Sequence, residues 1–229
     1  MARYHPEVTI MFADLVSFTS MCSVLGAPVV MSFLNTLFCA FDDLCDKHGV
    51  YKVETVGDGF VVAGGLMGVD QDGFRSVNQH TDPLHACKVF ALARDMLRVA
   101  AATPLPHTGA PVGLRVGLHC GPCTSGVIGR KMPRFCLFGD TMNVASRMET
   151  TCSVGSIHLS QAAYTCLQQQ QRTHIHALRC QPELQAVALA LELEQGSLQE
   201  GWEPTGGLEV KGKGLMQTWR WRPPSPAAQ

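Results

Sequence analysis

A nearly continuous apolar run, Val8 to Asp14, ends abruptly in an acidic residue close to the start of the sequence. This pattern predicts a β-strand that is buried on both faces and carries a carboxylate at its end. A helix is expected to follow, because apolar residues repeat at intervals of three and four between Val30 and Leu44. Gly49 lies where the C-terminal cap of that helix belongs.

A hairpin is expected next. The β-prone runs Val50 to Val56 and Phe60 to Ala63 lie on either side of an Asp-Gly pair, which places Asp58 at the tip of the turn. After a loop over residues 64–82, the spacing of apolar residues predicts a second helix over Pro83 to Ala102.

Three further elements complete the predicted core. Leu114 to His119 alternates between apolar and polar residues and predicts a half-buried strand. Phe135 to Phe138 predicts another strand, and Gly139 to Glu149 a short helix. The order β, α, β, β, α, β is that of the split βαβ, ferredoxin-like arrangement. The predicted fold class is therefore α+β, a ferredoxin-like core with additional C-terminal strands and a helix.

The C-terminal part of the sequence carries weaker patterns. Ser160 to Gln168 predicts a short helix, and the Gln-rich stretch 168–206 reads as an insertion. Val210 to Arg220 predicts a closing hairpin. Residues 1–222 are interpreted as one catalytic domain and residues 223–229 as a disordered tail.

Composition limits the classes of function. The 229 residues fit one large domain, and 18 Lys and Arg against 19 Asp and Glu leave a net charge of -1. No nucleic acid polymer and no direct membrane contact are expected, since both would favour a basic excess. We find no secretory stretch and no window of roughly 18 apolar residues that could span a bilayer. Ten cysteines, mostly scattered through apolar stretches, indicate a reducing compartment, so a cytoplasmic location is expected.

Two acidic residues stand out in the predicted topology. Asp14 ends a strand and Asp58 tips the hairpin, so antiparallel packing of these elements can bring both carboxylates to one end of the sheet. Either residue alone is more often a turn or cap residue. Together they predict a site for hard divalent cations, because Mg²⁺ takes one or two carboxylates along with phosphate oxygens.

Three ordered segments surround these residues: Phe12 to Thr19, Glu54 to Gly59, and Cys136 to Met148. In them the sequence resembles the class III nucleotide cyclases, and specifically the guanylyl cyclases, over most of residues 7–165 and again at 208–221. The resemblance implies a fold in which two such domains pair head to tail, with active sites in the cleft between them.

The resemblance also implies a metal and phosphate site. Asp14 and Asp58, with the backbone of Leu15, would hold two divalent ions, Mg²⁺ or Mn²⁺. The backbone from Leu15 onward, including Phe18 and Thr19, would cradle the terminal phosphates at the start of a helix. Two metals can activate a ribose 3′-hydroxyl for in-line attack on the α-phosphorus and neutralise the departing pyrophosphate.

Four further positions match phosphate and ribose ligands of the family. Arg115 and Lys211 would contact the phosphates, although Lys213 competes with Lys211 for this role. Asn143 would position the ribose, and Arg147 would stabilise charge on the transferring phosphoryl group. Without the resemblance, each of these residues reads as a solvated surface group.

The choice of base rests on Glu54 and Cys136. A carboxylate facing the N1–H and N2–H donors of guanine, and a thiol donating to O6, would be complementary to that base. GTP is therefore the expected substrate and cyclic GMP the product. Because one chain contains both halves of the implied site, a homodimer can build two equivalent sites. A heterodimer with a related cyclase chain would serve as well.

Two other functions compete with this interpretation. A binding or regulatory module with a cyclase fold but no turnover would be expected to lack a metal Asp, the Asn or the Arg, and all are present. Cys120 and Cys123 have the CxxC spacing of thiol–disulfide proteins, but the following residues are β-like rather than helical. A regulatory disulfide or an adventitious metal is then a better reading of the two cysteines than redox catalysis.

Overall fold

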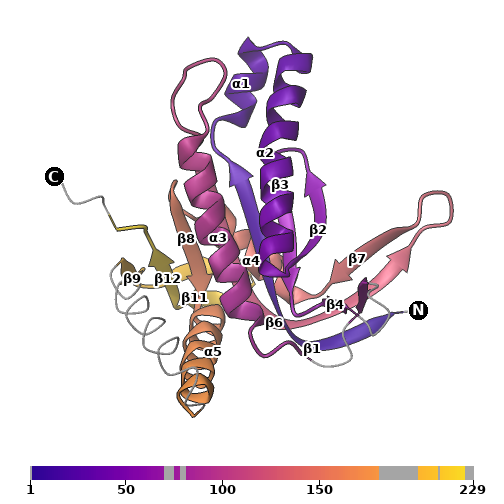
Figure 1. The fold of residues 1–229 in the computed structure, drawn as a ribbon, viewed down its shortest axis with the longest axis vertical. Helices are drawn as coiled ribbons and strands as arrows, with labels where there is room; N and C mark the ends of the chain where they lie inside the picture. Colours follow the sequence, from indigo (N-terminus) through magenta and orange to yellow (C-terminus); the bar gives the residue numbers. More distant parts are fainter. Residues whose placement is uncertain (1, 70–74, 78–80, 181–200, 211, 225–229) are drawn as a thin grey trace.

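The computed structural model describes residues 2–69, 75–77, 81–180, 201–210 and 212–224. Figure 1 shows long helices standing against one face of a twisted sheet, with a shorter helix on the other face. The elements of the first half are β1 (Arg3–Leu15), α1 (Phe18–Val24), α2 (Ala27–His48), β2 (Tyr51–Val56), β3 (Gly59–Gly64), β4 (Met67–Val69), β5 (Arg75–Val77) and α3 (His85–Ala102). Those of the second half are β6 (Leu114–Ile128), β7 (Arg134–Phe138), α4 (Asp140–Thr150), β8 (Ser156–Ser160), α5 (Gln161–Arg179), β9 (Trp202–Pro204), β10 (Leu208–Val210), β11 (Gly214–Met216) and β12 (Thr218–Trp221).

The main sheet has the strand order β2-β3-β1-β6-β8-β12-β9, and β7 pairs with the far half of β6. Its first four strands, β2-β3-β1-β6, are antiparallel neighbours in the order of a ferredoxin-like core. β8 joins β6 in parallel and extends the sheet. The predicted α+β fold class is confirmed.

β1 is buried on both faces, as its apolar run predicts. Met11 and Ala13 belong to the core beneath α2 and α3, whereas Val8 and Ile10 belong to a second core cluster on the α4 side. Successive residues of a strand point to opposite faces, so one continuous apolar run fills both layers.

Gly117 in β6 allows α4 to lie directly on the sheet. A Cβ at this position would lie 2.0 Å from the backbone nitrogen of Glu149 and 2.5 Å from the carbonyl carbon of Met148. No side chain therefore fits between β6 and the end of α4. This close approach sets the height of α4 above the strands.

The described structure differs from the sequence prediction in its C-terminal part. β8 was not predicted, and α5 runs to Arg179 instead of ending at Gln168. Within the predicted insertion 168–206, β9 joins the edge of the sheet by pairing with β12, while residues 181–200 lie outside the described residues. β10 and β11 form the predicted hairpin. Residues 225–229 of the predicted tail also lie outside the described part.

Helix α2 corrects one expectation. Among the described helices it alone is long and apolar enough to cross a membrane, judged by length and composition. The sequence had predicted no such segment. Its residues Leu37, Phe41 and Cys45 are buried in the core against the sheet, and Gly49 caps it in the left-handed conformation as predicted. None of the ten cysteines, all of which lie in the described part of the chain, forms a disulfide.

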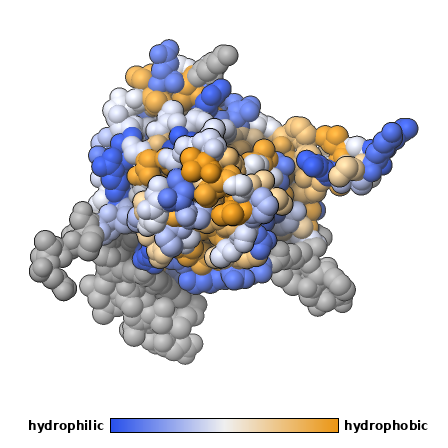
Figure 2. Space-filling view, turned by 90° about the horizontal axis from the view of Figure 1, so that it is seen from above, coloured by the Kyte–Doolittle hydropathy of each residue, from blue (hydrophilic) through white to orange (hydrophobic). Residues whose placement is uncertain are grey.

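Beyond the body of the sheet, β6 and β7 continue as a protruding hairpin, here called the β6–β7 arm (residues 126–136) (Figure 1). Apolar residues of the arm face solvent, with Val127 59%, Ile128 54% and Met132 73% exposed. Figure 2 shows apolar atoms along this projection and a hydrophilic tip. Exposed apolar residues gathered on a projecting hairpin are typical of a contact surface.

Candidate active site

One end of the sheet collects the predicted metal residues. Asp14, near the end of β1, lies opposite Gly59 of β3 on one side and Arg115 of β6 on the other. Asp58 lies in the β2–β3 turn next to Gly59, close enough to Asp14 for a side-chain hydrogen bond between the two carboxyl groups. The two carboxylates that the sequence separates by 44 positions therefore lie side by side.

Arg115 lies among these carboxylates. Its Nη2 donates to Asp14 Oδ2 at 2.6 Å, and its Nε lies 3.0 Å from Glu149 Oε1. Burial alone would lower the pKa of Arg115, but the hydrogen bond to Asp14 and the attraction of Glu149 raise it. The guanidinium remains charged and holds both acids in place.

Glu149 is a site residue that the sequence analysis missed. Its side chain is only 9% exposed, and it reaches Arg115 from the last turn of α4, over Gly117. The available signal was periodicity: Thr141, Ala145 and Glu149 share a spacing of four along α4, so an acid continues the buried stripe of the helix. A charged residue at such a position is rarely buried unless it is paired.

The site carries more negative than positive charge. Burial raises the pKa of Asp58, and repulsion from Asp14 adds to the shift. Burial also raises the pKa of Glu149, with Arg115 opposing it and Asp14 and Asp58 reinforcing it. Three carboxylates facing one guanidinium form a set of hard oxygen ligands, and such a set fits Mg²⁺ or Mn²⁺ better than a soft metal.

The backbone after Asp14 makes an unusual turn. Ser17 has φ 67°, the one non-glycine residue of the described chain with a positive φ, and its side chain does not cap α1. Phe18 packs partly into the core and Thr19 is exposed. Backbone held in a sparsely populated region is enriched at ligand-binding turns. Leu15 itself is buried, so only its main chain faces the site.

A β-bulge aims Glu54 toward the α4 side of the sheet. The register of β2 against β3 shifts between Lys52 and Glu54, so Glu54 pairs with Val61. Val61 shares its face of β3 with Ala63, which lies in the α4-side cluster. Without the bulge, Glu54 and Lys52 would share the other face, since alternate residues of a strand face the same way.

Cys136 lies in β7 near the start of β2. Its neighbour Phe135 packs edge-on against Tyr51, with ring centroids 5.9 Å apart. The Cys136 thiol is partly exposed and donates to the carbonyl of Arg134 at 3.6 Å. The strands that carry Glu54 and Cys136 therefore approach each other without pairing.

Asn143 and Arg147 project from the exposed face of α4, one turn apart. Neither side chain makes a hydrogen bond or ion pair with another residue of the described chain. Lys211, predicted to contact phosphates, lies outside the described residues. Lys213 is described, and its ammonium group pairs with Asp140 at the start of α4.

The CxxC pair is not arranged for redox chemistry. Cys120 belongs to the core beneath α3, whereas Cys123 belongs to the α4-side cluster, so the two thiols face opposite sides of β6. Burial raises the pKa of Cys123 to about 11. A disulfide between these residues would require the strand to break, which removes the alternative based on this motif.

Comparison with known proteins adds independent evidence on the family of the chain. A sequence profile described as the adenylate and guanylate cyclase catalytic domain matches residues 1–221. The chain is similar to guanylyl cyclase C of Mus musculus, with 42% identity over 176 residues, 76% of this chain and 15% of that protein. It is also similar to guanylate cyclase D of Mus musculus, with 40% identity over 221 residues, 95% of this chain and 16% of that protein.

A solved structure agrees with the sequence matches. The guanylate cyclase domain of RhGC from Catenaria anguillulae, in complex with GTP, superposes with a TM-score of 0.74 and 30% identity, covering 96% of this chain and 98% of that chain. The chain thus spans 15% to 16% of the two curated relatives but nearly all of this single-domain structure.

Proposed function

Because the chain belongs to the adenylate and guanylate cyclase catalytic domain family, we propose that it converts GTP into 3′,5′-cyclic GMP and pyrophosphate. The observation that carries the proposal is the gathering of Asp14, Asp58 and Glu149 around Arg115 at one end of the sheet. The two curated relatives at 40% to 42% identity are named guanylyl or guanylate cyclases, and the structural neighbour was solved with GTP.

Asp14 and Asp58 are the proposed metal ligands. Two divalent ions bound there, Mg²⁺ or Mn²⁺, would supply Lewis acidity to the ribose 3′-hydroxyl and neutralise charge on the pyrophosphate that leaves. The raised pKa of Asp58 supports this role, because a carboxylate that is costly to ionise alone gains most from a cation. Glu149 supplies a third negative charge at short range.

Arg115 is proposed to exchange partners when substrate binds. It holds Asp14 at 2.6 Å and Glu149 at 3.0 Å in the free protein, so it is positioned and charged before the triphosphate arrives. A guanidinium is suited to phosphate oxygens because its donors form a fixed planar fork. Glu149 then acts as a positioning residue that keeps the guanidinium at the end of the sheet.

Asn143 and Arg147 are proposed to act on the reacting centre of GTP. Their exposed side chains lack partners in the described chain and are free to reach a ligand or another protein surface. Asn143 would orient the ribose, so that the 3′-oxygen can displace pyrophosphate from the α-phosphorus. Arg147 would stabilise the charge that develops on the phosphoryl oxygens during this step.

The proposed active form is a dimer, either a homodimer or a heterodimer with a related cyclase chain. One chain contains both a carboxylate half and a base-reading half, so a two-fold arrangement can complete two sites. The exposed apolar residues of the β6–β7 arm support this proposal, since a projecting apolar surface gains free energy when a partner covers it.

Activity can be tested directly with purified protein, GTP and Mn²⁺ or Mg²⁺, with chromatographic detection of cyclic GMP. The parent should form cyclic GMP, and Asp14→Ala should lower the rate at least about 100-fold, because a ligand to both ions is lost. Asp43→Ala, on the exposed face of α2, is the matched control and should retain the parental rate. An Asp14→Ala protein as active as the parent would refute the assignment of the carboxylates. Inactive parent protein at every concentration tested would support a silent regulatory module instead.

Base selection is proposed to rest on Glu54 and Cys136. The bulge that turns Glu54 toward the α4 side and the approach of β7 to β2 support a shared role. We expect Glu54→Lys with Cys136→Asp to shift preference from GTP toward ATP by at least about 10-fold, because unpaired polar groups reject the wrong base. The control pair, Glu209→Lys with Cys39→Asp, makes the same changes on exposed surfaces. Equal GTP preference in both double variants would contradict this part of the proposal.

A further inference from the structure

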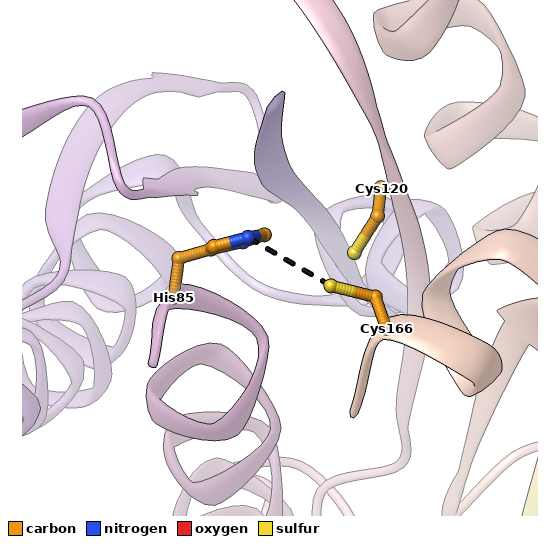
Figure 3. A group of neighbouring side chains, drawn as sticks. All are labelled: His85, Cys120 and Cys166. Carbon is orange, nitrogen blue, oxygen red and sulfur yellow. Dashed lines mark hydrogen bonds between the residues drawn. The ribbon is translucent and has the colours of Figure 1, made fainter. Parts of the chain in front are cut away.

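Three potential metal ligands converge beside the middle of β1 and β6, away from the end that carries Asp14 and Arg115. His85, the first residue of α3, Cys120 in β6 and Cys166 in α5 each direct a ligand atom into one space, and these atoms all lie within 4.8 Å of one another. Figure 3 shows the three side chains pointing toward one another from three separate elements, with the imidazole of His85 bonded to the Cys166 thiol. His85 and Cys120 are buried.

The separation between His85 and Cys166 is close to that of two ligands in a tetrahedral site. His85 Nε2 lies 3.7 Å from Cys166 Sγ. Zn–S bonds of about 2.3 Å and Zn–N bonds of about 2.0 Å require ligand atoms roughly 3.3 to 3.8 Å apart. Glu7 in β1 offers a fourth ligand, with Oε1 3.6 Å from Cys166 Sγ and Oε2 4.0 Å from His85 Nε2. Because its side chain is 53% exposed, Glu7 can turn further toward the other three ligands to complete the coordination.

A fully buried hydroxyl supports the first two ligands. Thr9 Oγ1 lies 2.6 Å from His85 Nδ1 and 2.9 Å from Cys120 Sγ. The hydroxyl can accept from the Nδ1–H and donate to the sulfur of Cys120 at the same time. That pattern leaves Nε2 of His85 unprotonated and facing the cluster, and a hydrogen bond on the other ring nitrogen commonly orients a metal-bound histidine.

Gln170 supports the third ligand. Its Nε2 donates to Cys166 Sγ at 3.3 Å, and its Oε1 accepts from the backbone nitrogens of Ala86 and Cys87. One amide therefore links the cysteine of α5 to the first turn of α3.

The cluster is separate from the catalytic end of the sheet. Thr9 lies five residues from Asp14 along β1, and Cys120 lies five residues from Arg115 along β6. Five residues of strand span about 16 Å. The chemistry differs as well, because sulfur and imidazole favour zinc-like ions whereas carboxylates favour magnesium.

We propose that His85, Cys120 and Cys166, completed by Glu7, bind a zinc-like divalent ion that ties α3 and α5 to β1 and β6. Binding would release the thiol protons of Cys120 and Cys166, because the metal takes both sulfurs as thiolates. The same residues have no part in the proposed cyclase chemistry, so the site would stabilise the domain instead of contributing to turnover.

The first test uses the parent chain, reduced and freed of metal, in excess Mg²⁺ so that the carboxylate site is filled. Titration with Co²⁺ should produce thiolate-to-cobalt charge-transfer absorption that saturates at one ion per chain and is displaced by Zn²⁺. Zn²⁺ should also slow alkylation of Cys166 at least about 10-fold while leaving that of exposed Cys39 unchanged. Absence of the absorption at saturating Co²⁺, or equal alkylation of Cys166 with and without Zn²⁺, would overturn the proposal.

Variants then locate the site. Cys166→Ser and His85→Gln should weaken Co²⁺ binding at least about 100-fold, and Thr9→Val about 10- to 100-fold through the lost hydrogen bonds. Cys39→Ser is the matched control and should bind as the parent does. A parental titration in both Cys166→Ser and His85→Gln would place the ion elsewhere and refute the assignment. If His85→Gln or Cys166→Ser protein does not fold, the alkylation result on the parent decides the question.

Discussion

Replacing Gly117 by alanine should displace α4 while leaving the rest of the fold in place. The added Cβ would lie 2.0 Å from the Glu149 nitrogen and 2.5 Å from the Met148 carbonyl carbon, where ordinary contact begins at 3.4 Å. Both atoms are backbone, so no side-chain rotation relieves the overlap. The end of α4 must therefore move away from β6 by about 1.4 Å, the difference between the 2.0 Å contact and the 3.4 Å of ordinary contact.

The displacement of α4 should lower both the stability of the domain and its activity. Overpacking a core typically lowers the free energy of unfolding by about 1–3 kcal/mol, occasionally more. At roughly 2–4 °C per kcal/mol for a domain of this size, Tm should fall by about 2–12 °C. Because Asn143, Arg147 and Glu149 move with the helix, cyclase kcat should fall about 100-fold, as expected for a displacement near 1 Å.

Thermal unfolding and initial rates of cyclic GMP formation, measured at a temperature where both proteins are folded, test this reasoning. Gly126→Ala in the same strand is the matched control, since its Cβ would meet only Ala2 at 3.6 Å, an ordinary contact. Its Tm should stay within about 1 °C of the parent. A Gly117→Ala protein with parental Tm and parental kcat would refute the claim that contact of α4 with β6 sets the site.

Three further outcomes are expected. Asp58→Asn should abolish activity yet raise Tm in metal-free buffer at pH 7, because burial raises the pKa of Asp58. The protonated Asp58 carboxyl contributes its full stability below pH 3.8, and this contribution is lost as pH rises through the raised pKa. Equal Tm of parent and variant at pH 7 would contradict this. Burial lowers the pKa of His119 to about 4, so the free energy of unfolding of the parent should fall by at most about 3 kcal/mol as pH falls from 6.5 toward 4. In urea titrations over the same pH range, His119→Asn should lose less stability than the parent. Ile128→Glu changes a 54% exposed position of the β6–β7 arm and should weaken dimerisation at least about 10-fold, as measured by sedimentation. It should also lower specific activity at low protein concentration. Unchanged dimerisation would argue against the arm as the dimer contact.

Elements with a regular local pattern were predicted well. The apolar run of β1, the periodic stripe of α2 and the Asp-Gly turn between β2 and β3 all depend on residues close together in the sequence. β8 lacked such a pattern because Ser156, His158 and Ser160 are polar yet buried. The burial of His158 and Ser160 is explained by distant partners: His158 Nε2 lies 2.9 Å from Thr218 Oγ1 in β12, and Ser160 Oγ lies 2.6 Å from His119 Nδ1 in β6.

In the candidate site too, the residues placed by local sequence were predicted and those placed by distant contacts were not. Asp14 and Asp58 were predicted together because strand ends and hairpin tips follow from local sequence. Glu149 was not, since its role depends on the distance between α4 and β6 at Gly117, which no local pattern encodes. The bulge that turns Glu54 toward the α4 side is likewise a property of the pairing between β2 and β3.

By itself the sequence determined the ferredoxin-like order of elements and two acids at one sheet end, because backbone propensity and apolar periodicity act over a few residues. Only the tertiary structure decided that Arg115 bridges Asp14 to Glu149, and that Cys120 faces His85 and Cys166 instead of Cys123. These contacts join residues 34 or more positions apart, and strand register and helix packing bring them together through burial of the core as a whole.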